Sequence, residues 1–311
     1  MELGSDRDKA RLRSGSGPTA GAVYSADLAI PGVGLSDRQW PYVARWRLGL
    51  VTAPTGYTCG NLTRTQVRCG AELDCSGDHS AACATGPWRN QRHDGLCEVW
   101  ADICEELGAH VRREVFVEEL TRGTPQEAVL DVWAHGVADL PDLLLDITVR
   151  HPSCDIYMPA ASAISGYAAQ RGELEKQARY PPAAGRAVWP LAHETFGRLG
   201  ERAEELLQQC AAIAARRAHR RGRQPGNVLR NWRARLDATL GRGLAAQLHQ
   251  ACAGTPGQPT LRLRLGRASA GDLEARCPLA DAGDAVGGDA GDGLGGSGGN
   301  DDGGGIGGRP A

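Results

Sequence analysis

The sequence predicts an α/β fold in which a small sheet is flanked by helices. Three observations predict it: short apolar runs typical of buried strands, apolar residues at helical spacing on both sides of those runs, and a cysteine-rich stretch before them. We therefore divide the chain into a flexible N-terminal segment at 1–37, a cysteine-rich region at 38–97, the α/β core at 98–197, basic helices at 198–252 and a disordered tail at 253–311.

The helices and strands of the core follow from their apolar spacing and from the residues that end them. Four apolar residues at helical spacing predict a helix over 93–107, which Gly108 ends. A second helix over 165–180 ends at Pro181, because proline cannot continue a helix. Strands are predicted at Val111–Val117, Ala128–Trp133, Leu143–Val149 and Ala187–His193, the second and third as a hairpin.

Outside the core, a short helix is expected within 40–50 and two longer helices at 198–221 and 228–249. The final part of the chain is different, because residues 284–311 include 13 glycines and five aspartates. Such a segment buries too little apolar surface to offset its chain entropy, which predicts disorder.

Composition and charge exclude several classes of protein. The formal net charge of −2 excludes a highly basic, histone-like protein. No run of 18 apolar residues occurs, which excludes a membrane-spanning helix. The N-terminus is charged from Glu2 onward, so we expect no secretory signal and an intracellular protein. In that setting the ten cysteines are expected to be thiols or metal ligands rather than disulfides.

A cluster of potential metal ligands lies in the cysteine-rich region: Cys59, Cys69, Cys75, His79 and Cys83. Thiolate and imidazole are the ligands that tetrahedral zinc prefers, and the spacing of His79 and Cys83 is typical of a small zinc knuckle that Cys69 begins.

The fourth ligand is open, because no CxxC occurs there: it is Cys59 or Cys75, or else His93 or Cys97 from the next helix. Zinc would be structural, since a loop so poor in apolar residues needs a metal to hold its shape. The alternative is a set of scattered free thiols.

Two aspartates in the predicted hairpin are each enclosed by apolar residues. Asp131 lies between Leu130 and Val132, and Asp146 lies between Leu145 and Ile147. Isolated charges are costly in buried strands, and two of them would repel unless a cation lay between them.

Mg²⁺ held by two carboxylates beside a lysine suits phosphodiester hydrolysis. Lys176 is the only lysine in the predicted folded region, and Glu114 could supply a third carboxylate. Asp142 is a rival to Asp131, because Pro141-Asp142 is a formal "PD", but it lies only four residues before Asp146. The alternative is that both aspartates lie at strand edges or turns and that Lys176 is solvated.

The last two predicted helices are rich in arginine. Residues 210–242 contain a single acidic residue, Asp237, and nine arginines: Arg216, Arg217, Arg220, Arg221, Arg223, Arg230, Arg233, Arg235 and Arg242. A basic face of this kind suits the phosphate backbone of a nucleic acid, although a solvated helix face would look similar.

The order of these motifs resembles the C-terminal region of non-LTR retrotransposon polyproteins, most closely the retroelement-derived proteins abundant in dinoflagellates. The motifs are CG-x3-D-x3-DH-x3-C, RHD, a strand with glutamate, LDVWAHG, LDITVRHP, E-x2-K-x3-Y and P-x3-ETFG, and they cover about residues 10–250. In that family a zinc knuckle precedes a restriction-like endonuclease of the PD-(D/E)XK class, downstream of a reverse transcriptase.

The resemblance implies a restriction-endonuclease-like core at 98–197 with a small mixed sheet flanked by helices, and a zinc knuckle in 38–97. It implies Mg²⁺-dependent cleavage of one DNA strand in the nucleus. Asp131 resembles the PD aspartate although Leu130 replaces the proline, Asp146 resembles the second acid, and Lys176 matches a lysine that this branch carries on the following helix in place of Thr148.

Cys69, His79 and Cys83 match three knuckle ligands. No YxDD-type motif occurs, so we expect a fragment, a degenerate copy or a domesticated remnant without the reverse transcriptase core. The alternative function is a non-catalytic remnant of a reverse transcriptase polyprotein that binds zinc and a nucleic acid, either DNA or RNA.

Overall fold

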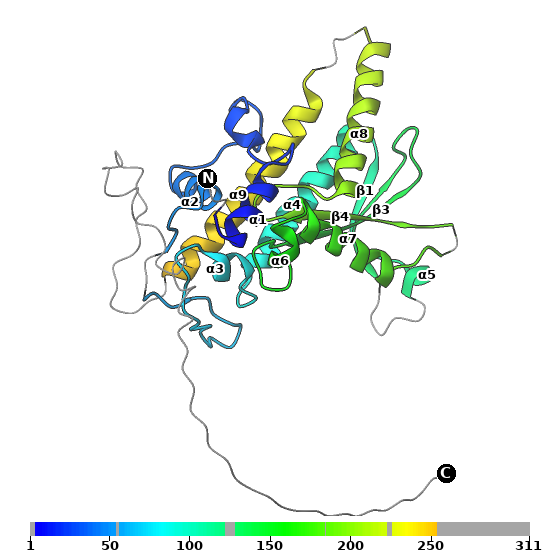
Figure 1. Ribbon diagram of the computed structural model, residues 1–311. Coiled ribbons are helices and arrows are strands. Elements are labelled where there is room, and N and C mark those ends of the chain that lie inside the picture. The colour runs from blue at the N-terminus through cyan, green and yellow to red at the C-terminus, as the bar shows by residue number, and fades with distance from the viewer. Residues whose placement is uncertain (1–3, 54–55, 122–127, 184, 223–225, 254–311) are drawn as a thin grey trace, which may run out of the picture. The chain divides into compact units, whose positions relative to one another are not determined.

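The computed structural model describes residues 4–53, 56–121, 128–183, 185–222 and 226–253, all of which belong to one compact unit (Figure 1). The predicted tail at 253–311 lies outside the described residues except for Ala253. In the described part of the chain, no helix is both long enough and apolar enough to cross a membrane.

The architecture is a mixed α/β fold around a four-stranded mixed sheet, as the sequence predicts. The strands β1 (His110–Phe116), β2 (Val129–His135), β3 (Leu143–Arg150) and β4 (Val188–Glu194) lie in the order β1-β2-β3-β4. The first three form an antiparallel meander, which includes the predicted hairpin, and β4 runs parallel to β3.

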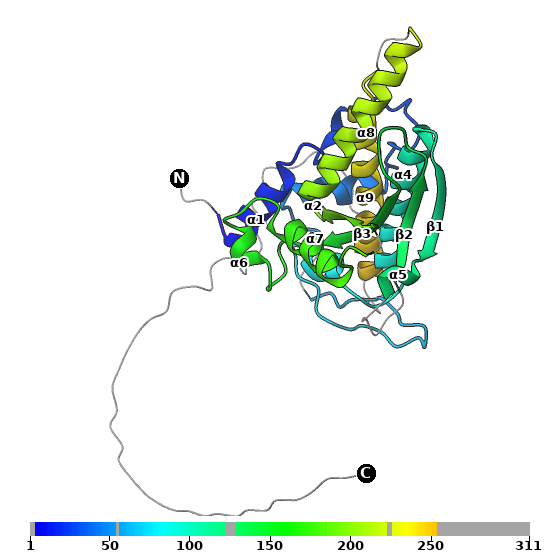
Figure 2. The ribbon, with the colours of Figure 1, turned by 90° about the vertical axis from the view of Figure 1, so that its right-hand side faces the viewer.

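Helices cover both faces of this sheet (Figures 1 and 2). Helix α4 (Trp88–Glu106) places Leu96, Trp100 and Ile103 against odd-numbered residues of β3 in the main core. Helix α7 (Tyr167–Arg179) contacts β3 and β4, and a Cβ on its Gly172 would lie only 3.1 Å from Cγ2 of Thr148. Because side chains alternate along a strand, the even-numbered residues of β3, Asp146 among them, face α7.

The two long C-terminal helices complete the fold. Helix α8 (Glu201–Arg220) packs on β4, and α9 (Val228–Ala253) packs along α4 and the short helix α2 (Gln39–Leu48). Three further short helices lie in the connections: α3 (Asp78–Ala82), α5 (Glu118–Thr121) and α6 (Met158–Ala161).

The N-terminal segment differs from the flexible stretch predicted at 1–37. It contains α1 (Asp6–Gly15) and a 3₁₀ helix η1 (Ala22–Ser25). Its anchors are contacts with distant residues: the Val23 N–H donates to Asp237 of α9 over 3.0 Å, and that carboxylate also pairs with Arg47. Such anchors leave no local apolar pattern, which is why the sequence suggested a loop.

Candidate functional site

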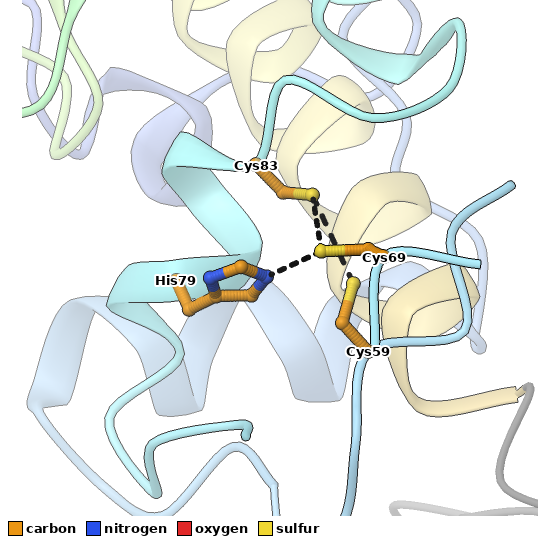
Figure 3. A group of neighbouring side chains, drawn as sticks. All are labelled: Cys59, Cys69, His79 and Cys83. Carbon is orange, nitrogen blue, oxygen red and sulfur yellow. Dashed lines mark hydrogen bonds between the residues drawn. The ribbon is translucent and has the colours of Figure 1, made fainter. Parts of the chain in front are cut away.

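Cys59, Cys69, His79 and Cys83 form a compact group in which the four candidate ligand atoms all lie within 4.8 Å of one another (Figure 3). The Sγ atom of Cys83 lies 3.8 Å from Sγ of Cys59 and 3.8 Å from Sγ of Cys69, and Cys69 Sγ lies 3.5 Å from Nε2 of His79. Ordinary zinc bond lengths in a tetrahedron place two sulfurs about 3.8 Å apart and a sulfur and a nitrogen about 3.6 Å apart. This Cys₃His group can therefore bind a metal ion such as zinc.

Local backbone structure brings the four ligands together. Cys59 and Cys69 lie on two facing loop segments, where the Cys59 N–H donates to Ala71 O over 2.7 Å and the Cys69 N–H donates to Asn61 O over 2.8 Å. Gly70 directly follows Cys69 and has a φ of +66°, a left-handed backbone conformation that glycine adopts without strain.

His79 lies on α3 and Cys83 directly follows that helix, one turn later. The carboxylate of Asp74 accepts hydrogen bonds from the backbone N–H groups of Asp78 at 2.8 Å and His79 at 2.7 Å, so it holds the start of the helix that carries the imidazole. Hydrogen bonding to the Cys83 sulfur raises the pKa of His79 to about 9, which reflects the close approach of thiolate and imidazole.

The structure resolves the choice of fourth ligand in favour of Cys59. Cys75 lies outside the group and is disulfide-bonded, which departs from the expectation that the cysteines are thiols or metal ligands. His93 and Cys97 also lie elsewhere, in a second group with Asp131.

Asp131, Asp146 and Lys176 meet at the sheet surface. The Nζ atom of Lys176 lies 2.8 Å from Oδ1 of Asp146, and the Asp131 carboxylate lies close enough to perturb the ionisation of Asp146. The three side chains come from β2, β3 and α7. The structure thus brings together two apolar-flanked aspartates and the one lysine of the core.

The two strands diverge at this point. The pairing of β2 with β3 ends at Val132 and Leu145, and beyond it side chains replace the strand-to-strand hydrogen bonds of Ile147. Oδ2 of Asp131 accepts from the Ile147 N–H over 2.6 Å, and Nε2 of His93 lies 3.1 Å from the Ile147 carbonyl oxygen. A carbonyl oxygen only accepts, so Nε2 donates. Asp131 is therefore positioned by the backbone of the neighbouring strand.

The two aspartates differ in their electrostatic surroundings. Asp146 is 3% exposed, and burial raises its pKa to about 6 with a further rise from the Asp131 charge, although Lys176 acts in the opposite direction. Burial also disfavours the charged form of Asp131, but hydrogen bonding and charge from His93 outweigh it and hold the pKa below its usual value. Oδ2 of Asp146 is buried and has no hydrogen-bond partner among the described residues.

Two other predicted residues do not join this group. Glu114 is exposed on β1, where its φ of +51° breaks the regular strand geometry, and no contact of its carboxylate with Asp146 or Lys176 occurs in the described part of the chain. Asp142 lies in the β2–β3 connection, where its Oδ1 is 2.6 Å from Nδ1 of His135. Both are therefore peripheral to the aspartate pair.

Sequence reasoning did not place His93 and Cys97 in this region. They lie four residues apart on α4, one helical turn, and with Asp131 they form a group whose ligand atoms lie within 4.8 Å of one another. The available signal was the i, i+4 spacing between His93 of the RHD motif and Cys97 beyond it, but the sequence alone also allowed both residues to serve the knuckle.

Most arginines of α8 and α9 contact the protein itself. Side-chain acceptors hold Arg216, Arg233 and Arg235, and backbone carbonyls hold Arg217, Arg230 and Arg242. Arg223 lies outside the described residues.

Comparisons of the chain with protein-family models, with curated proteins and with solved structures find no match.

Proposed function

We propose that this chain is a retrotransposon-derived, endonuclease-like protein that cleaves DNA phosphodiester bonds with Mg²⁺ in the nucleus. The observation that carries the proposal is the meeting of Asp131, Asp146 and Lys176 where β2 and β3 diverge. An antiparallel meander followed by a parallel strand, with helices on both faces, is consistent with assignment to the PD-(D/E)XK class.

The residues present fit a hard divalent cation. Asp146 offers a buried carboxylate oxygen without a hydrogen-bond partner in the described structure, and Asp131 offers a second carboxylate beside it. When bound, Mg²⁺ polarises a phosphate oxygen and lowers the pKa of a coordinated water.

The chain's own groups supply the remaining chemistry. The Asp131 carboxylate is fixed by the Ile147 N–H and by His93, so it needs little reorganisation when substrate arrives. The Lys176 ammonium donates to Asp146 while its side chain stays 20% exposed, so it can face a phosphate that approaches from solvent and offset its negative charge. The Cys₃His group stabilises the loop that carries its ligands and precedes the α/β core.

The test is nicking of supercoiled plasmid by the full-length protein with Mg²⁺. We expect Asp146→Asn and Lys176→Met each to lower the nicking rate about 100-fold. Asp142→Asn and Lys9→Met are the matched controls, since the first removes the exposed rival carboxylate and the second removes the other lysine, which pairs with Asp6 on the surface.

Equal nicking by wild type and Asp146→Asn would overturn the assignment of this site. DNA binding that needs no Mg²⁺ and is accompanied by no nicking would overturn the proposed endonuclease activity. It would favour the alternative, a non-catalytic remnant that binds nucleic acid.

A further inference from the structure

We propose that His93, Cys97 and Asp131 form a second metal site, separate from the Cys₃His group, that takes a thiophilic divalent ion such as Zn²⁺. The three residues bring one imidazole, one thiol and one carboxylate to a common point. A sulfur ligand favours Zn²⁺ or Co²⁺ over Mg²⁺, which prefers oxygen.

The spacing of the ligand atoms fits tetrahedral coordination. Nε2 of His93 lies 3.3 Å from Oδ2 of Asp131 and 3.7 Å from Sγ of Cys97. Zinc bond lengths in a tetrahedron place a nitrogen and an oxygen about 3.3 Å apart, and a nitrogen and a sulfur about 3.6 Å apart. Sγ of Cys97 also lies 3.6 Å from Nδ1 of His93, so the imidazole ring or the Cys97 side chain must turn before Nε2 and Sγ can bind one ion.

A neighbouring carboxylate is in place to orient the imidazole. Nδ1 of His93 lies 3.2 Å from Oδ1 of Asp94, so an Nδ1–H can donate to that carboxylate while Nε2 faces the metal. Zinc-bound histidines ordinarily have such a partner on the other ring nitrogen. On binding, Nε2 gives up its proton and its hydrogen bond to Ile147, and the Cys97 thiol loses its proton to become a thiolate ligand.

Three protein ligands leave the fourth position for water or another small ligand, as in zinc sites that are open to solvent. Cys97 is buried at the base of the group, whereas the His93 and Asp131 side chains are 30% and 20% exposed, so an ion can enter from their side. Asp131 belongs to this group and also to the proposed Mg²⁺ pair. If the proposed nuclease function holds, Zn²⁺ at this site removes Asp131 from that pair and inhibits Mg²⁺-dependent nicking.

Cobalt spectroscopy on the full-length protein tests the site without any assay of cleavage. The Cys₃His group, with three sulfur ligands, is first filled with one equivalent of Zn²⁺, and Co²⁺ is then titrated in. We expect wild type to bind one Co²⁺ with the visible bands of tetrahedral cobalt and a sulfur-to-cobalt charge-transfer band.

Cys97→Ala should lose the charge-transfer band, and Asp94→Asn should weaken Co²⁺ binding about 10- to 100-fold. Cys104→Ala is the matched control, because Cys104 is a buried thiol on the same helix that lies outside the group. Asp131→Asn, which keeps the size of the side chain, should weaken Co²⁺ binding while circular dichroism stays unchanged.

Absence of a tetrahedral cobalt spectrum in zinc-loaded wild type would overturn the proposal, as would a charge-transfer band that persists in Cys97→Ala. Neither result bears on nicking by the Mg²⁺ enzyme, so failure of this site and failure of the nuclease proposal are distinguishable.

Discussion

Nε2 of His151 lies 3.0 Å from Oδ1 of Asp78, which joins the end of β3 to the helix that carries His79. His151 follows β3 directly, and its Nδ1 lies 2.8 Å from Oγ1 of Thr195 after β4. Arg7 of α1 pairs with the same aspartate. Burial opposes ionisation of Asp78, but His151 and Arg7 outweigh it and hold the pKa below its usual value. The Cys₃His loop is thus bonded to the sheet through one charged side chain.

Removal of this link should weaken both the fold and the metal loop. We expect Asp78→Ala to lower the free energy of unfolding by about 1–3 kcal/mol, because it leaves His151 and Arg7 without their acceptor. Zinc should also transfer faster to a chelator, since α3 loses its attachment. Urea unfolding and a colorimetric chelator assay measure the two effects. Asp155→Ala, at an exposed position, serves as control, and equal stability of both variants would contradict the prediction.

The pH dependence of the proposed cleavage should follow Asp146. Burial raises the pKa of this carboxyl to about 6, so it is protonated below that pH and loses the charge that attracts Mg²⁺. We expect the single-turnover nicking rate to level off above pH 6 and to fall toward tenfold per pH unit below it. Rates measured from pH 5 to 8 at saturating DNA test this, with Asp142→Asn expected to give the same profile. A rate that stays constant down to pH 4.5 would argue against Asp146 as a ligand.

Glu173 gives a stability prediction of opposite sign to that of an ordinary ion pair. It is 5% exposed, and its Oε1 accepts from the Arg202 N–H in the first turn of α8 over 3.2 Å. Burial raises its pKa from 4.5 to about 7, so the folded state binds the proton more tightly than the unfolded state does. Stability is therefore greatest below pH 4.5 and falls as pH rises through 7.

Glu173→Gln keeps an oxygen acceptor and removes the charge. We expect wild type to lose about 1–3 kcal/mol of unfolding free energy between pH 5 and 8 relative to this variant. Chemical unfolding at several pH values measures the difference. Glu175→Gln, a change at an exposed position two residues further along α7, should keep the wild-type slope. If the unfolding free energy of wild type and of Glu173→Gln changed equally with pH, Glu173 would not be the source of this pH dependence.

The anchor of the N-terminal segment should be strongly stabilising. The Asp237 side chain is fully buried, pairs with Arg47 and accepts the Val23 N–H. Because its removal leaves the buried Arg47 guanidinium without its carboxylate partner, we expect Asp237→Ala to cost about 3–5 kcal/mol. Limited proteolysis should also cut earlier in the first 37 residues. Asp37→Ala, at an exposed position, should change neither measurement.

The sheet could be predicted because its strands are short apolar runs bounded by turn residues, and the same pattern exposed Asp131 and Asp146 as charges among apolar neighbours. Residues that lie directly opposite each other on adjacent antiparallel strands share one face of the sheet. Lys176 could be named as their cationic neighbour because it is the only lysine in the predicted folded region. These inferences needed only local periodicity and residue chemistry.

Other features depend on contacts that spacing does not encode. Cys59, Cys75, His93 and Cys97 were equivalent candidates in the sequence, and only the path of the loop distinguishes Cys59. The divergence of β2 from β3, which brings His93 to Asp131, is also a tertiary event. Likewise α1 and η1 are held by polar bonds to residues far along the chain.

The arginines of α8 and α9 have a consequence for the ionic-strength response of the protein. Each phosphate neutralised by a free cation releases counterions and steepens the salt dependence of affinity by about 0.9 in the logarithmic slope. Six of these arginines are already bonded to carboxylates, carbonyls or a hydroxyl of their own chain. An arginine bonded to a carbonyl keeps its positive charge, but one paired with a carboxylate is already neutralised. A duplex on this surface would therefore release fewer counterions than the same number of unpaired arginines would allow, and its affinity would fall less steeply with salt.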